Sequence, residues 1–83
     1  MEIKVKSIKL FCSIVETGSL IAAANKNLLS APAASRVLSQ LEDRLGFKLF
    51  HRTNRNLSLT EEGADFYRIA MESVRAWKHL EDY

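Results

Sequence analysis

One stretch of the sequence, from Ala23 to Arg52, restricts the possible folds more than any other part of the chain. Ser30 is a favourable residue for capping the start of a helix. Pro32 then stands in the first helical turn, where a missing amide hydrogen costs nothing. The next glycine along the chain, Gly46, is typical of a helix end. These residues predict a helix that begins directly after Ser30, with a tight turn before it and a short basic hairpin after it.

Two further helices are predicted before that one. Apolar side chains recur at helical spacing across residues 5–17, and Gly18 ends this segment. Ser19 then caps a second, short helix that is rich in alanine. In the turn at residues 25–29, we expect Asn27 to accommodate a left-handed backbone conformation.

The helix predicted over about residues 31–45 has two unlike sides. The side expected to face the core carries Ala34, Val37, Leu38, Leu41 and Leu45. The side expected to face away from the core carries Ala33, Ser35, Arg36, Ser39 and Gln40. Such a helix can bury one face and offer the other to a partner.

The rest of the chain predicts a hairpin and a long helix. Short strands are expected at residues 49–52 and 57–59, and Thr60 then caps the last helix. The fold class is therefore mainly α: a winged helix-turn-helix of three helices and a two-stranded wing, followed by a long C-terminal linker helix. We place the DNA-binding unit at residues 1–59 and the linker or dimerisation helix at residues 60–83, as parts of one compact unit.

The last helix is apolar on two sides. One stripe holds Ala64, Tyr67, Met71 and Val74, and the other holds Phe66, Ile69, Ala70, Trp77 and Leu80. A helix that is apolar around so much of its circumference is expected to be buried on two sides. We therefore predict a homodimer through residues 61–83, with an interface formed by Tyr67, Met71, Val74 and Trp77. A purely intramolecular core is the alternative.

Charge is unevenly distributed, although the net charge is only +2. Residues 1–60 hold nine Lys and Arg against four Asp and Glu, whereas residues 61–83 hold three against six. A basic body indicates an anionic partner such as nucleic acid. An ordinary solvated surface would give the same count, so charge alone leaves both readings open.

Several function classes are disfavoured. The lone cysteine, Cys12, allows no internal disulfide, and no Cys or His cluster has metal-ligand spacing, so we expect neither a metal nor a cofactor. The longest apolar run, at residues 20–24, is too short for a membrane span, so we expect a cytoplasmic protein without a membrane partner. No catalytic grouping is evident, so we do not expect an enzyme.

Taken together and in order along the chain, the predicted helices and hairpin resemble the N-terminal DNA-binding domain of LysR-type transcriptional regulators. The resemblance covers essentially the whole chain. It is carried by Phe11, Gly18-Ser19, Ala23-Ala24, Ser30-x-Pro32-Ala33-x-Ser35-Arg36, Leu41-Glu42-x-x-Leu45-Gly46-x-x-Leu49-Phe50-x-Arg52 and Leu59-Thr60-x-x-Gly63. It implies a winged-helix module that dimerises through its linker helix, with tetramers common among full-length members. In those members a domain that senses a small-molecule effector follows. That domain is absent from these residues, so we expect a fragment, and a naturally short protein is the alternative.

Two positions depart from the family pattern. Ala31 stands where the family usually has glutamine, which can read a base edge with two hydrogen bonds, whereas alanine offers only a methyl contact. Asn27 stands where leucine is usual, so Leu28 or Leu29 is expected to fill that space in the core.

The resemblance and the helix pattern together predict sequence-specific binding of double-stranded DNA for transcriptional regulation. The helix at about 31–45 would lie in the major groove, and the wing at about 49–59 along the backbone or minor groove. The expected DNA contacts are Ser19, Ala31, Pro32, Ala33, Ser35, Arg36, Ser39, Gln40, Arg52 and Arg55. The alternative is a helical protein–protein interaction module with weakened or lost DNA binding, which Ala31 favours.

Overall fold

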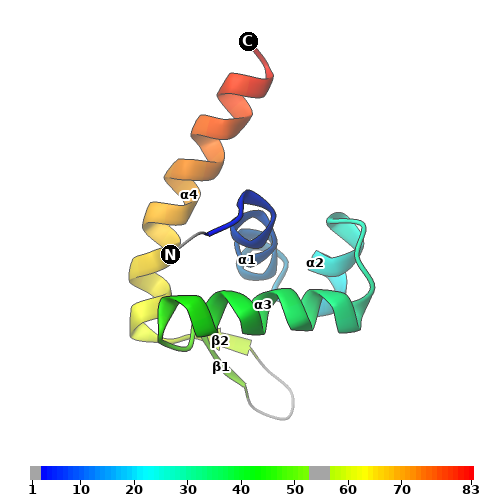
Figure 1. Ribbon diagram of the computed structural model, residues 1–83, viewed down its shortest axis with the longest axis vertical. Coiled ribbons are helices and arrows are strands. Elements are labelled where there is room, and N and C mark those ends of the chain that lie inside the picture. The colour runs from blue at the N-terminus through cyan, green and yellow to red at the C-terminus, as the bar shows by residue number, and fades with distance from the viewer. Residues whose placement is uncertain (1–2, 53–56) are drawn as a thin grey trace.

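The computed structural model describes residues 3–52 and 57–83 of the chain. In order, the elements are α1 (Val5–Thr17), α2 (Leu20–Lys26), α3 (Ala31–Leu45), β1 (Phe50–Arg52), β2 (Leu57–Leu59) and α4 (Glu61–Glu81), as Figure 1 shows. The two strands pair antiparallel, with Phe50 opposite Leu59. The predicted winged helix-turn-helix with a long final helix is therefore confirmed.

Local signals set the helix boundaries as predicted. Ser19, Ser30 and Thr60 each cap a helix by accepting a hydrogen bond from the backbone N–H three residues later, at 2.8 to 3.2 Å. Gly18 and Gly46 end α1 and α3 with φ angles of 73° and 82°. Glycine adopts this left-handed conformation without the steric cost that other residues meet.

The turn between α2 and α3 differs from the prediction. Leu28 holds the left-handed conformation, with φ of 59°, whereas Asn27 has φ of −100°. The Asn27 amide nitrogen instead donates to Ser13 Oγ at 3.0 Å and to the Ala23 carbonyl at 2.8 Å, and these two bonds hold it at the helix end. Leu28 is 93% exposed, so it is Leu29 that packs against the core.

The core lies where α1 meets the other elements. Phe11 is fully buried at its centre, and its ring centroid lies 5.5 to 6.0 Å from those of Phe50, Phe66 and Tyr67. These aromatic contacts join α1 to the wing and to the first half of α4. The wing and the last helix therefore share one core with the three-helix unit.

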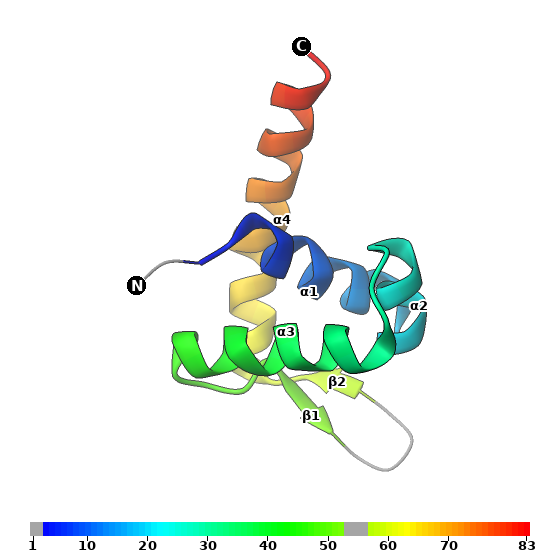
Figure 2. The same cartoon turned by 45° about the vertical axis from the view of Figure 1, so that its right-hand side comes forward.

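The last turns of α4 project beyond the three-helix unit, as Figures 1 and 2 show, although Val74 and Trp77 still pack on the core. This extension accounts for the elongated shape, with extents of 42 × 25 × 21 Å. Among the described residues, no helix combines the length and apolar character that a membrane crossing requires.

Candidate nucleic-acid interface

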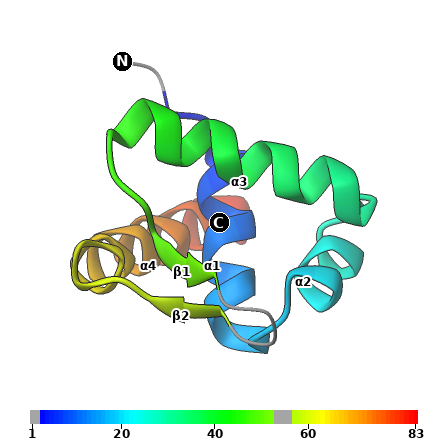
Figure 3. The ribbon, with the colours of Figure 1, turned by 90° about the horizontal axis from the view of Figure 1, so that it is seen from below.

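Three parts of the fold border one side of the molecule: α3, the β1–β2 hairpin and the beginning of α2. Figure 3 views this side from below and shows the hairpin alongside α3, with α2 near the N-terminal end of α3. The helix α3 packs against α1 and α2 through its apolar side. Its other side is left open between the hairpin and α2.

The predicted contact residues on α3 differ in exposure. Pro32, Arg36 and Gln40 are exposed, whereas the others are half-buried, namely Ala31, Ala33, Ser35 and Ser39. The three exposed residues follow one another at intervals of four, so they stand along one line of the helix. An extended partner lying against α3 could contact all three of them.

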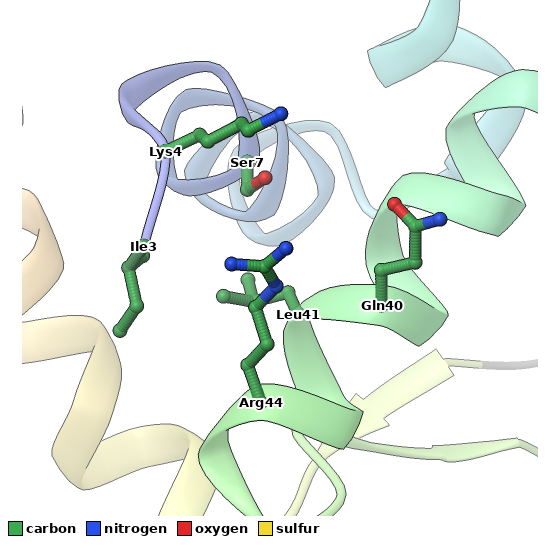
Figure 4. A pocket seen from close by; sticks show the side chains of 6 residues that line it. All are labelled: Ile3, Lys4, Ser7, Gln40, Leu41 and Arg44. Carbon is green, nitrogen blue, oxygen red and sulfur yellow. The ribbon is translucent and has the colours of Figure 1, made fainter. Parts of the chain in front are cut away.

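Gln40 marks the edge of that line nearest to α1. Figure 4 shows Arg44 pointing from α3 toward Ser7 and Lys4 at the beginning of α1, with Gln40 one turn earlier on α3. Between them is a pocket of about 30 Å³, roughly the space of one water molecule. The pocket is too small for an organic ligand. The positive charges of Lys4 and Arg44 make this edge favourable for an anion.

Ser19 lies at the start of α2 and is already engaged as a cap. Its Oγ accepts from the Ala22 N–H at 3.1 Å, and its carbonyl accepts from the Thr17 hydroxyl at 3.0 Å. A serine hydroxyl keeps one hydrogen to donate after accepting such a bond. The capping role is therefore present, and it is compatible with a phosphate contact.

Arg52, at the end of β1, is paired inside the protein. Its Nη2 atom donates to Glu42 Oε1 at 3.0 Å, and its side chain is 41% exposed. The sequence analysis names Glu42 only as part of the family motif and predicts neither its burial nor its contacts. The available signal was an acidic residue directly after Leu41, beside the apolar stripe of the helix. Arg55, also predicted to contact DNA, lies outside the described residues.

The residues predicted to form a dimer interface lie partly against their own protomer. Tyr67, Val74 and Trp77 are half-buried and pack on the core, and Met71 is half-buried as well. The most exposed large apolar residue in the middle of α4 is Ile69, at 65%. The helix therefore shares its apolar surface between the core and the solvent.

An apolar groove of about 220 Å³ runs beside Ile69. It is bounded by Ile3 and Ile8 on one side and by Phe66 and Trp77 of α4 on the other.

Two titratable groups near the core have shifted pKa values. Burial, and then the nearby Glu16 carboxylate, raises the pKa of the Cys12 thiol to about 11. The same two causes, in the same order, raise the pKa of Tyr67. Cys12 is 4% exposed, so it is a protonated, buried side chain at neutral pH. No group of three or more His, Cys, Asp or Glu residues able to hold a metal occurs within residues 3–52 and 57–83.

Comparison with known families gives a match at residues 5–64 to the model described as a bacterial regulatory helix-turn-helix protein of the lysR family. The HTH-type transcriptional regulator CrgA of Neisseria meningitidis is 41% identical over 75 residues, covering 90% of this chain and 25% of CrgA. The HTH-type transcriptional activator AaeR of Escherichia coli is 38% identical over 65 residues, covering 78% of this chain and 21% of AaeR. The chain thus spans about a quarter of the length of these relatives.

Solved structures of DNA complexes share the fold. The CbnR DNA-binding domain in complex with DNA has a TM-score of 0.87 and 29% identity, covering 96% of this chain and 92% of that one. The BenM DNA-binding domain with the benA site 1 DNA has a TM-score of 0.89 and 29% identity, covering 96% and 90%. The likeness extends over all four helices and the hairpin.

Proposed function

The chain belongs to the lysR family of bacterial regulatory helix-turn-helix proteins, and from this premise we propose that it binds double-stranded DNA in a sequence-specific manner to regulate transcription. The observation that carries the proposal is the exposed line of Pro32, Arg36 and Gln40, on a helix flanked by the wing and by α2. A winged helix-turn-helix inserts its second helix into the major groove. In this chain that helix is α3.

Different residues of α3 would contact different parts of the DNA. Arg36, which is long, charged and exposed, would reach a phosphate or a guanine edge. The hydroxyls of Ser35 and Ser39 are half-buried and suited to short-range contacts with the backbone. Ala31 would offer a methyl group to a thymine in place of the two hydrogen bonds of a glutamine. Pro32 and Ala33 would lie against base edges with Ala31, because the N-terminal end of the helix enters the groove.

The wing would lie along the backbone or the minor groove, where negative potential favours arginine. Arg52 and Arg55 are the residues assigned to this contact. Ser19, at the start of α2, would donate to a phosphate from the other side of α3. Arg52, Arg55 and Ser19 would thus extend the DNA-binding surface beyond α3.

The second part of the proposal is a homodimer through α4. Residues 1–59 would form the DNA-binding unit and residues 60–83 the linker helix, joined by the shared aromatic core. The apolar groove beside Ile69 supports a partner on the open side of α4, with Met71, Tyr67, Val74 and Trp77 extending the surface. In a longer protein, tetramers and a small-molecule effector domain would follow from the family. The site of action would be the cytoplasm, and no enzymatic activity is proposed.

The test is a titration of two DNA duplexes across salt concentrations. One duplex is selected by the protein from a random pool, and the other is the same sequence shuffled. We expect preference for the selected duplex and affinity that falls steeply with salt, because phosphate contacts release counterions. Equal affinity for both duplexes, or no dependence on salt, would favour the protein–protein interaction module instead.

A further inference from the structure

A buried carboxylate joins the recognition helix to the wing. The Glu42 side chain, on α3, is 1% exposed. Its Oε2 atom accepts from the Leu49 backbone N–H at 2.7 Å, and its Oε1 atom accepts from Arg52 Nη2 at 3.0 Å. Lys48 Nζ lies 3.9 Å from the same Oε1 atom. Each oxygen of one carboxylate thus bonds to a different part of the segment that forms β1.

This arrangement is poorly explained by stability alone. A buried charge costs free energy unless it is paired and hydrogen-bonded, and well-packed apolar residues of similar volume are often as stable or more so. The carboxylate instead fixes the orientation of β1 relative to α3. Because its two oxygens hold Leu49 before β1 and Arg52 at the end of β1, the strand cannot rotate relative to α3 without breaking one of the bonds.

The same segment is held from the opposite side by the start of α4. The Leu49 carbonyl accepts from the Thr60 backbone N–H at 3.0 Å, and the Thr60 hydroxyl donates to the Lys48 carbonyl at 2.6 Å. Leu49 itself is fully buried. Residues 48–49, which we call the root of the wing, are therefore held between α3 and the start of α4. Glu42 supplies the bond on the α3 side.

We propose that Glu42 is a positioning residue that sets the wing relative to α3, and that Arg52, besides the DNA contact proposed above, helps Glu42 to hold the wing in place. The proposal rests on the DNA-binding function proposed above. Glu42 carries a negative charge next to surfaces that would meet phosphates. On charge alone, its removal would tighten DNA binding, whereas loss of the wing's position would weaken it. The two effects have opposite signs, so they can be told apart.

The experiment compares E42Q with wild type, using the full chain and a duplex selected by the wild type. Glutamine keeps an oxygen for the Leu49 N–H but turns a donor toward Arg52. We expect E42Q to bind about tenfold more weakly. The matched control is D43N, which removes a charge from the adjacent exposed position of α3 and should bind at least as tightly as wild type. E42Q binding as tightly as D43N would overturn the proposal.

A double-mutant cycle tests the role of Arg52. R52Q should weaken binding about tenfold in the wild-type background and by a smaller factor in the E42Q background, because in E42Q the part of the Arg52 effect that acts through Glu42 is already lost. Equal losses in both backgrounds would show that Arg52 acts only through its own DNA contact and not through Glu42, against the proposal. The cycle separates a direct phosphate contact from action through Glu42.

Hydrogen exchange of the free protein supplies a readout without DNA. In E42M, which has no oxygen to accept from the Leu49 N–H, the Leu49 amide should exchange faster while core amides of α1 keep their protection, and E42Q, which keeps that oxygen, should show a smaller change. Unfolding of both variants would contradict the positioning role, because Glu42 would then determine the stability of the whole fold. A wild type that fails to prefer any duplex would refute the proposed function, and the exchange result would still test the Glu42–Leu49 bond.

Discussion

At the scale of single residues, Arg36 is the side chain best placed to reach DNA from α3. It is exposed on the line shared with Pro32 and Gln40, and the core-facing side of the helix does not depend on it. We expect Arg36→Ala to weaken binding of the selected duplex by about tenfold to a hundredfold, with no change in thermal stability.

Fluorescence anisotropy with a labelled duplex measures this effect. The control is Arg75→Ala, which removes the same charge from an exposed position on α4. An equal loss of affinity in the two variants would mean that Arg36 contributes only to the overall charge.

The buried thiol of Cys12 makes a prediction about pH. Its pKa is raised from 9.0 to about 11 in the fold, mainly by burial, so the folded chain keeps a proton that the unfolded chain loses. This contribution to stability is complete below pH 9 and is lost as the pH rises toward 11, by up to about 1.4 kcal/mol per pH unit.

Denaturant unfolding of wild type and Cys12→Ala at several pH values measures the difference. The wild type should lose stability more steeply than the variant between pH 9 and 11, and its thiol should react slowly with a thiol reagent at pH 8. Parallel curves together with fast labelling would contradict the burial of this group.

Which residue-scale features the sequence could predict depends on how local their causes are. Ser30 caps α3 through a bond to a residue three positions away, so its role could be inferred from spacing. Asn27 was wrongly expected to be left-handed, because its conformation is set by a bond to Ser13 on another helix. Glu42 was missed for a similar reason, since its partner Arg52 lies on a strand that only the fold brings near.

At the scale of elements, the start of α4 approaches the root of the wing very closely. A Cβ atom added at Gly63 would overlap the Leu49 carbonyl oxygen, much closer than van der Waals contact allows. Alanine is a better helix former than glycine by about 1 kcal/mol, but this clash with backbone outweighs that gain. We expect Gly63→Ala to destabilise the fold by about 1–3 kcal/mol.

The free energy of unfolding from denaturant titration checks this expectation. Glu72→Ala, at an exposed position in the middle of α4, is the control and should change stability by less than about 0.5 kcal/mol. A Gly63→Ala protein as stable as wild type would show that α4 can move away from the wing.

The turn between α2 and α3 carries a strained residue. Leu28 has a φ of 59° and its side chain is 93% exposed. Burial of the side chain therefore does not offset the steric cost of the left-handed backbone conformation. Asparagine accepts this conformation more readily. We expect Leu28→Asn to raise the free energy of unfolding by about 0.5–1 kcal/mol.

Leu29→Asn is the matched comparison, because Leu29 packs against the core. That variant should be destabilised when measured by thermal or denaturant unfolding. Destabilisation of Leu28→Asn to the same extent would mean that Leu28 makes packing contacts that the structure does not show.

Most element boundaries could be predicted from the sequence, because Ser19, Ser30 and Thr60 cap three helix starts and Gly18 and Gly46 follow two helix ends. Which element covers each apolar helix face could not be predicted from the sequence. The stripe containing Tyr67 and Val74 was assigned to a dimer interface, yet both side chains are half-buried against their own protomer. Helical spacing shows which residues share a face, whereas the element that covers the face is set by long-range packing.

At the scale of the whole molecule, the open side of α4 predicts self-association. Ile69 is 65% exposed beside the apolar groove, so a charge at this position should oppose burial in an interface. We expect Ile69→Glu to shift the protein from dimer to monomer, as measured by sedimentation equilibrium.

Ile21→Glu provides a matched control, because Ile21 is also 65% exposed but lies on α2. It should leave the dimer intact. Dissociation by both substitutions, or by neither, would contradict an interface centred on α4.

Methylation interference shows whether α3 lies in the major groove of a specific duplex. The N7 atom of guanine is exposed in the major groove, so a methyl group there blocks a helix that occupies that groove. We predict that N7 methylation within each half of the selected duplex excludes it from the bound fraction. Recovery of such duplexes in the bound fraction at every methylated position would contradict the account.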